Sequence, residues 1–76
     1  MIVQNYLMCQ SGRKIVAKNV LKYREKRGLK REELSLLLDY DPSYISKLEK
    51  GKINTTIDVL ENIANILEIK LSDLFE

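Results

Sequence analysis

The sequence predicts an all-α fold of five short helices with no sheet. Three observations support this class. Apolar residues recur at the three- and four-residue spacing of a helix surface over most of the chain. Gly28, Gly51 and the segment 39–42, which contains Pro42, interrupt that spacing at intervals that suit short helices. The length of 76 residues allows one domain, near the lower limit for a self-sufficient core.

The first twelve residues are too apolar for a free tail, but their structure is open. Several apolar pairs are spaced i,i+4, yet the segment is short and an extended arm fits equally well. Ser11 and Gly12 predict a break before the next element. We therefore expect residues 1–14 to form an N-terminal arm that packs on the domain or on a second subunit. Residues 15–76 should form the domain itself.

A first helix is expected from about Lys14 to Lys26, ended by Gly28. Its apolar stripe includes a charged residue, Arg24. A charge on a buried stripe needs a partner, and Glu49 is the candidate. The stripe consists of Ala17, Val20, Leu21 and Arg24.

The stretch 31–52 predicts two helices joined by a tight polar turn. Asp41 is a good N-cap for the second helix, and Pro42 suits its first helical position. Ile45 and Leu48 then face inward, which leaves an outer face that is polar and basic. Such a pair of helices suits a DNA major groove. The apolar stripe of the first helix is Leu34, Leu37 and Leu38.

A fourth helix should follow, capped by Thr55 or Thr56. Its exposed side is acidic and amidic, so it should point away from DNA. A last turn ends in Leu74 and Phe75, whose apolar side chains should pack on the core or on a partner subunit. The buried face of the fourth helix is expected to comprise Ile57, Leu60, Ile63, Ala64 and Leu67.

The charge is unevenly distributed, although the net charge is only +2. Residues 13–52 carry a net charge of +6, and residues 53–76 carry −4. A basic half and an acidic half imply that one face meets an anionic partner. From charge alone, two ordinarily solvated helical surfaces explain the pattern equally well.

The composition argues against several classes of function. The chain has one cysteine, Cys9, and no histidine, so we expect no internal disulfide, no metal and no cofactor. It lacks a glycine-rich loop and convergent carboxylates, so we do not expect an enzyme. No apolar run approaches the length of a membrane span, and the start does not read as a signal peptide. A reducing, cytoplasmic setting is expected.

Residues 20–75 carry an ordered series of motifs. They run V-x-x-Y-R at 20–24, G-L-x-R-E-E-L-S at 28–35, Y-I-S-K-L-E-K-G-K at 44–52, N-T-T-I at 54–57, L-x-x-I-A-x-x-L at 60–67 and L-x-D-L-F at 71–75. Each motif alone is weak, but all of them in this order are specific. On these motifs the chain resembles the lambda-repressor/Cro-like (XRE-type) helix-turn-helix DNA-binding family. Its small restriction–modification controllers share the spacing at 44–56.

The resemblance implies a compact lambda-repressor-like bundle of five helices, in which helices two and three read DNA. Positions matching Ser43, Tyr44, Ser46 and Lys47 would face base edges. Positions matching Arg31, Lys50, Lys52 and Asn54 would hold the phosphate backbone. The pair Arg24 and Glu49 matches a buried ion pair of the family.

Three residues depart from the family pattern. Arg31 replaces the usual glutamine, which keeps phosphate binding but weakens the inference of base reading. Ser35 replaces alanine and is small enough to preserve the helix crossing. Asp39 replaces a glycine that often has positive φ, and aspartate adopts that conformation at modest cost.

The resemblance implies a transcription regulator that binds double-stranded DNA, a repressor or activator. It would act as a homodimer on a palindromic operator and block or recruit polymerase. A second function stays open: an antitoxin-type protein-interaction module that holds a partner protein and regulates its own operon. That module would use the apolar N-terminal arm and the C-terminal Leu74 and Phe75.

Overall fold

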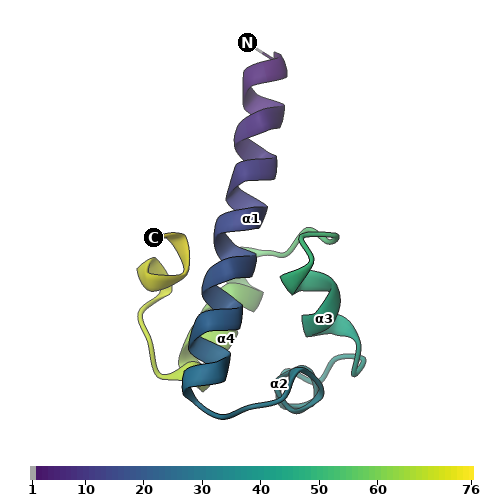
Figure 1. The fold of residues 1–76 in the computed structure, drawn as a ribbon, viewed down its shortest axis with the longest axis vertical. Coiled ribbons are helices and arrows are strands. Elements are labelled where there is room, and N and C mark those ends of the chain that lie inside the picture. Colours follow the sequence, from purple (N-terminus) through teal and green to yellow (C-terminus); the bar gives the residue numbers. More distant parts are fainter. Residues whose placement is uncertain (1) are drawn as a thin grey trace.

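A computed structural model of the chain describes the backbone of residues 2–76 and the side chains of residues 12–76. The all-α class is confirmed, but the described residues form four α-helices and a 3₁₀ turn rather than five α-helices. The elements are α1 (Ile2–Lys26), α2 (Arg31–Leu37), α3 (Tyr44–Glu49), α4 (Ile57–Leu67) and η1 (Leu71–Phe75), as Figure 1 shows.

The first helix is longer than predicted. We expected it to begin near Lys14 after a break at Ser11 and Gly12, but α1 begins at Ile2 and passes through both residues. A glycine within a helix costs only about 1 kcal/mol relative to alanine, so a single one does not end a long helix. The N-terminal turns project beyond the other elements (Figure 1). Neither α1 nor any other described helix is apolar enough over a sufficient length to cross a membrane.

The contact predicted for the N-terminal arm, residues 1–14, stays a prediction. The side chains of residues 1–11 lie outside the described residues. The backbone of residues 2–14 belongs to α1, so a contact made by this segment would come from a helix.

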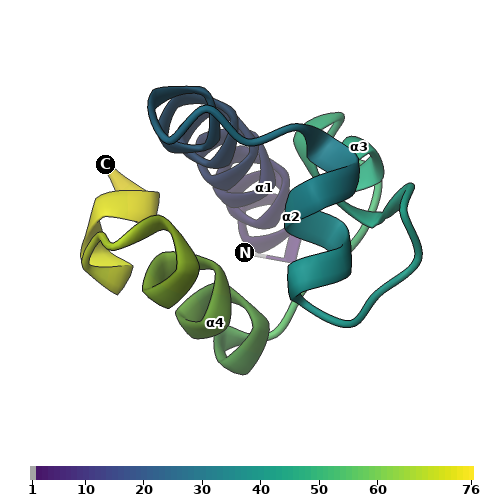
Figure 2. The ribbon, with the colours of Figure 1, turned by 90° about the horizontal axis from the view of Figure 1, so that it is seen from below.

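The core lies between one face of α1 and the inner faces of the later elements. In Figure 2, α4 and η1 lie on one side of α1, and α2 and α3 lie on the other. The stripe predicted on α1 is confirmed for Ala17, Val20 and Arg24, which are buried, while Leu21 is half-buried. The buried apolar residues are Val16, Ala17, Val20, Leu34, Ile45, Leu48, Leu60, Ile63, Ala64, Leu67 and Leu74.

A buried amide joins the C-terminal turn to α1. Asn19, which is 3% exposed, donates a hydrogen bond from Nδ2 to the carbonyl oxygen of Leu74 at 2.9 Å. This contact fixes the fully buried Leu74 against the core. It also explains why the predicted fifth helix is a tight 3₁₀ turn, because the backbone is held by a side chain of α1.

Two residues predicted to face the core are exposed. Leu37 is 59% exposed because it is the last residue of α2, where the chain is about to reverse. Ile57 is 56% exposed because it is the first residue of α4 and lies at the edge of the domain. Helical spacing therefore identified the buried faces but not the ends at which those faces stop.

Every α-helix ends beside a residue with a left-handed backbone. The φ angles are 69° at Gly28, 67° at Asp39, 69° at Gly51 and 58° at Glu68. The expectation that Asp39 adopts positive φ in place of glycine is confirmed. These residues set the lengths of α2 and α3, which at seven and six residues are too short to persist without tertiary packing.

Candidate nucleic-acid interface

The turn between α2 and α3 is held by the chain's own polar groups. The amide of Tyr40 donates to the carbonyl of Ser35 at 3.0 Å, which closes the turn around the left-handed Asp39. Asp41 Oδ1 accepts hydrogen bonds from the Ser43 amide at 2.9 Å and from Ser43 Oγ at 2.6 Å. These bonds lower the pKa of the Asp41 carboxyl below its ordinary value, the bond from the Ser43 hydroxyl most of all.

The second helix of the pair begins later than predicted. We expected Pro42 at its first position, but Pro42 and Ser43 form a turn and α3 begins at Tyr44. The Tyr44 amide donates to the Asp41 carbonyl at 2.9 Å, a three-residue spacing that is tighter than an α-helix. Asp41 still caps the segment, as its bond to the Ser43 amide shows.

A buried hydroxyl joins α2 to α3. Ser35 is completely buried, donates from Oγ to the Arg31 carbonyl at 2.9 Å and accepts from the Ile45 amide at 3.0 Å. The Ile45 amide lies in the first turn of α3, where no carbonyl of its own helix is available. Ser35 is therefore more than a small residue at a crossing, because it fixes the position of one helix on the other.

Three charged residues tie together α1, α2 and α3. Arg24 Nε donates to Glu49 Oε2 at 2.7 Å, and both side chains are buried. Arg31 Nε donates to the other oxygen of the same carboxylate, Oε1, at 2.9 Å. The hydrogen bond to Glu49 raises the pKa of the Arg31 guanidinium above its ordinary value. Arg24 Nη1 also donates to the carbonyl of Leu29 at 2.7 Å, which fixes the link between α1 and α2.

Arg31 keeps an accessible donor face despite this contact. Its side chain is 53% exposed, and the structure prints no hydrogen bond from its Nη groups within the described residues. The sequence-level prediction placed Arg31 on a phosphate and did not foresee its bond to Glu49. The structure shows Nε bound inward, which leaves the terminal nitrogens free to meet an anion from outside.

The residues predicted to read bases lie on or beside α3, but they differ in accessibility. Lys47 is exposed, whereas Ser43, Tyr44 and Ser46 are half-buried. The Ser43 hydroxyl already donates to Asp41, so its free capacity is as an acceptor. Of the four, Lys47 is the donor that the surrounding protein leaves most accessible.

Tyr44 is held by two neighbours. Its ring stacks on the ring of Tyr40, with centroids 4.4 Å apart and planes inclined by 22°. Its hydroxyl donates to Thr55 Oγ1 at 3.2 Å, which connects α3 to the loop before α4. The sequence analysis gave Tyr40 no role, although the i,i+4 spacing of the two tyrosines was a signal that they could meet. The pair presents one exposed edge, because Tyr40 is 39% exposed.

The residues predicted to hold phosphates surround the C-terminal end of α3. Lys50, Lys52 and Asn54 are all exposed. The Lys52 amide donates to the Lys47 carbonyl at 3.1 Å, so the backbone after α3 folds back on the helix. With Arg31 joined to the end of α3 through Glu49, four predicted anchors and Lys47 belong to one part of the molecule.

Comparison with known proteins places this arrangement in a wider group. A family model described as "Helix-turn-helix" matches residues 20–74. The uncharacterized HTH-type transcriptional regulator y4dJ of Sinorhizobium fredii is 32% identical over 62 residues, which cover 82% of this chain and 80% of that protein. The control protein C.MunI of Mycoplasma sp is 40% identical over 52 residues, which cover 68% and 70%.

A solved structure shares the fold over most of both chains. The crystal structure of the restriction-modification controller protein C.AhdI from Aeromonas hydrophila superposes with a TM-score of 0.79 at 26% identity. The match covers 87% of this chain and 96% of that one. The arrangement of α2 and α3 is therefore that of a known group and is not peculiar to this sequence.

Proposed function

Because the chain belongs to the XRE/Cro-like helix-turn-helix family of DNA-binding transcriptional regulators, we propose that it regulates transcription by binding a palindromic operator as a homodimer. The family is not enzymatic. The observation that carries the finer proposal is the grouping of exposed cations around α3, with Lys47 on the helix and Lys50 and Lys52 directly after it.

Phosphate contacts supply most of the affinity in this proposal. Arg31, Lys50 and Lys52 carry the charges that meet the DNA backbone, and the Asn54 amide adds a neutral donor. Arg31 supports this role because Nε is bound to Glu49 while the end of the guanidinium is exposed. A cation held in one orientation loses less side-chain entropy when it binds an anion.

Base recognition falls to the outer face of α3. Lys47 can donate to O6 or N7 of guanine, and the exposed edge of the Tyr40 and Tyr44 stack can contact a thymine methyl group. Ser43 and Ser46 are half-buried hydroxyls and constrain the sequence more weakly. The proposed division is therefore one strong reader, Lys47, supported by weaker contacts at 43, 44 and 46.

A dimer gives this small surface enough contacts for a specific site. Two copies related by a two-fold axis would place their α3 helices in successive major grooves about 34 Å apart. Bound near a promoter in the cytoplasm, the dimer would block polymerase or recruit it. The likeness to C.MunI and C.AhdI supports a place among the controllers of restriction–modification operons.

The test is selection of bound duplexes from a random pool by the full chain. The proposal expects enrichment of a palindrome with one fixed spacing between its half-sites. The Lys47→Ala variant, selected in parallel, should enrich the same spacing with weaker preference at one base pair of each half-site. Enrichment of single half-sites would contradict the homodimer, and no enrichment would contradict sequence-specific binding.

A further inference from the structure

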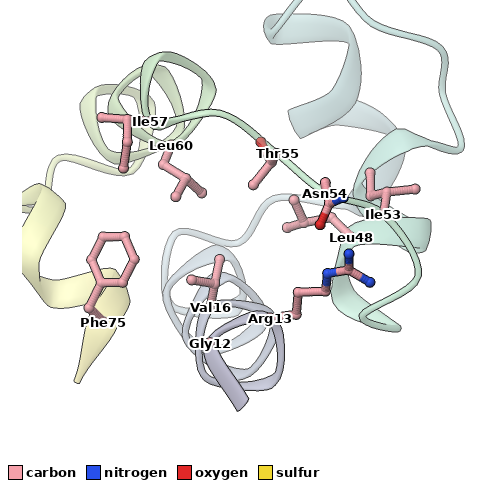
Figure 3. A pocket seen from close by; sticks show the side chains of 10 residues that line it. All are labelled: Gly12, Arg13, Val16, Leu48, Ile53, Asn54, Thr55, Ile57, Leu60 and Phe75. Atoms are coloured by element: carbon pink, nitrogen blue, oxygen red, sulfur yellow. The ribbon is translucent and has the colours of Figure 1, made fainter. Parts of the chain in front are cut away.

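An apolar groove opens on the side of the domain where α1 leaves the body. It lies between α1, the loop after α3, α4 and η1, and has a volume of about 200 Å³. Its floor consists of core side chains, Val16, Leu48 and Leu60, which are at most 6% exposed. In Figure 3, Ile57 and Phe75 lie on one side of the hollow and Arg13 on the other, with Val16 and Leu60 between them.

The rim of the groove exposes two large apolar side chains. Ile57 is 56% exposed and Phe75 is 45% exposed, and both line the hollow. Apolar side chains that flank an opening into the core form a continuous surface that water solvates poorly. Such surfaces mark sites of interaction with another macromolecule or ligand.

Arg13 adds an unmet polar requirement to the same groove. Its Nε atom is buried and has no hydrogen-bond partner among the described residues. A buried donor without an acceptor costs roughly 1–3 kcal/mol, so an acceptor supplied from outside would be favourable. The best acceptor for a guanidinium is a carboxylate.

The groove also carries the acid that such an interface needs. Asp58 follows Ile57 at the rim and is exposed. A two-fold interface brings the same patch together from both subunits, so it must be complementary to itself. A patch with an apolar hollow, a cation that lacks an acceptor and an exposed acid meets that requirement.

We propose that this groove is the surface through which two copies of the chain associate, with Arg13 of each copy facing Asp58 of the other. The inference rests on the proposed function, because it names the interface of the proposed homodimer. Leu48 of α3 forms part of the groove floor while its neighbour Lys47 is exposed. A partner in the groove would thus lie beside α3 and leave Lys47 accessible to DNA.

The first test measures the molar mass of the full chain by light scattering after size exclusion, over a range of concentrations. Ile57→Glu and Phe75→Glu should each raise the dimer dissociation constant about tenfold or more, because each would bury a charge without a partner. Both side chains are exposed in the isolated domain, and a glutamate suits the first turn of α4, so the fold should survive. Far-ultraviolet circular dichroism checks this.

Leu36→Glu is the matched control. Leu36 is 60% exposed, like Ile57, but it lies on α2 and does not line the groove. Its variant should dimerise as the wild type does. A monomeric wild type would contradict the proposed homodimer itself. A dimeric wild type that loses its partner through Leu36→Glu, and not through Ile57→Glu or Phe75→Glu, would overturn the groove as the interface.

A charge exchange tests the pairing of Arg13 with Asp58. Arg13→Asp and Asp58→Arg should each weaken the homodimer, because each places like charges opposite one another. When the two variants are mixed, every contact between them again joins opposite charges, and a heterodimer should form. Failure of the mixture to recover dimers would overturn this pairing.

Discussion

Arg31 and Glu49 join the first residue of α2 to the last residue of α3 through a hydrogen bond of 2.9 Å. The same carboxylate receives the buried Arg24, so one acid holds two cations from two helices. The two helices proposed to meet DNA are thus connected at the end of the pair opposite the turn. Their relative position depends on Glu49 as much as on the turn.

Glu49→Ala should lower the free energy of unfolding by roughly 3–5 kcal/mol, because it leaves the buried Arg24 without its counter-charge. Urea unfolding followed by circular dichroism measures this. Glu68→Ala is the control, since Glu68 pairs with Arg27 at 3.1 Å but both side chains are largely exposed. Its effect should stay within about 1 kcal/mol. Equal effects of the two substitutions would contradict the structural role of Glu49.

Ser35→Ala should lower the free energy of unfolding by about 1–3 kcal/mol, although alanine fits the space. The reason is the Ile45 amide, which would lose its acceptor while it remains buried. Hydrogen exchange should show faster exchange at that amide. Ser72→Ala, at an exposed serine, is the control and should change little. Unchanged exchange at Ile45 would show that another acceptor replaces the hydroxyl.

Lys47→Ala should weaken binding to the selected operator by roughly 1–3 kcal/mol and relax the preference at one base pair of each half-site. The exposed position of Lys47 on α3 is the reason. Binding is measured by fluorescence anisotropy with the operator and with each single-base variant of it. Uniform weakening over all of these duplexes would place Lys47 on phosphate instead.

Lys52→Ala should weaken binding to every duplex and reduce the salt dependence. The slope of log K against log salt should fall by about one unit per subunit, because one phosphate contact is lost. Lys70→Ala is the control, as Lys70 is an exposed lysine between α4 and η1, away from the proposed contacts. An unchanged slope for Lys52→Ala would exclude a phosphate contact there.

The stability contributed by Asp41 should depend on pH. Hydrogen bonds from Ser43 lower the pKa of the Asp41 carboxyl in the folded chain below its model value of 3.8. The contribution is therefore complete above the unfolded pKa and is lost as the pH falls through the folded pKa. Urea unfolding of wild type and Asp41→Asn should show a constant difference between about pH 5 and 7 that shrinks below about pH 4. A difference that does not vary with pH would contradict the role of the ionised carboxylate.

The sequence predicted the buried faces well because apolar spacing reports directly on them. Leu34, Ile45 and Leu48 lie in the core as expected. The bounds of the helices were predicted less well. Spacing does not reveal that a helix passes through Ser11 and Gly12, or that α3 starts after the turn at Pro42 and Ser43.

The candidate site was predicted as a set of positions but not as a set of contacts. The pairing of Arg24 with Glu49 follows from a charge on an apolar stripe, and the structure brings the two atoms within 2.7 Å. The second cation on Glu49 and the stacking of Tyr40 on Tyr44 depend on the angle between helices. That angle is a property of packing over the whole core, and no local pattern encodes it.

The left-handed backbone of Asp39 has a consequence for how the DNA face can evolve. A glycine at this position would avoid the cost of a side chain at positive φ, so the present turn is not the most stable one available. Changes at Lys47 or Ser43 that alter operator choice will often destabilise a domain this small. Asp39 is a site outside that face where a single substitution could compensate, which would let specificity diverge without loss of the fold.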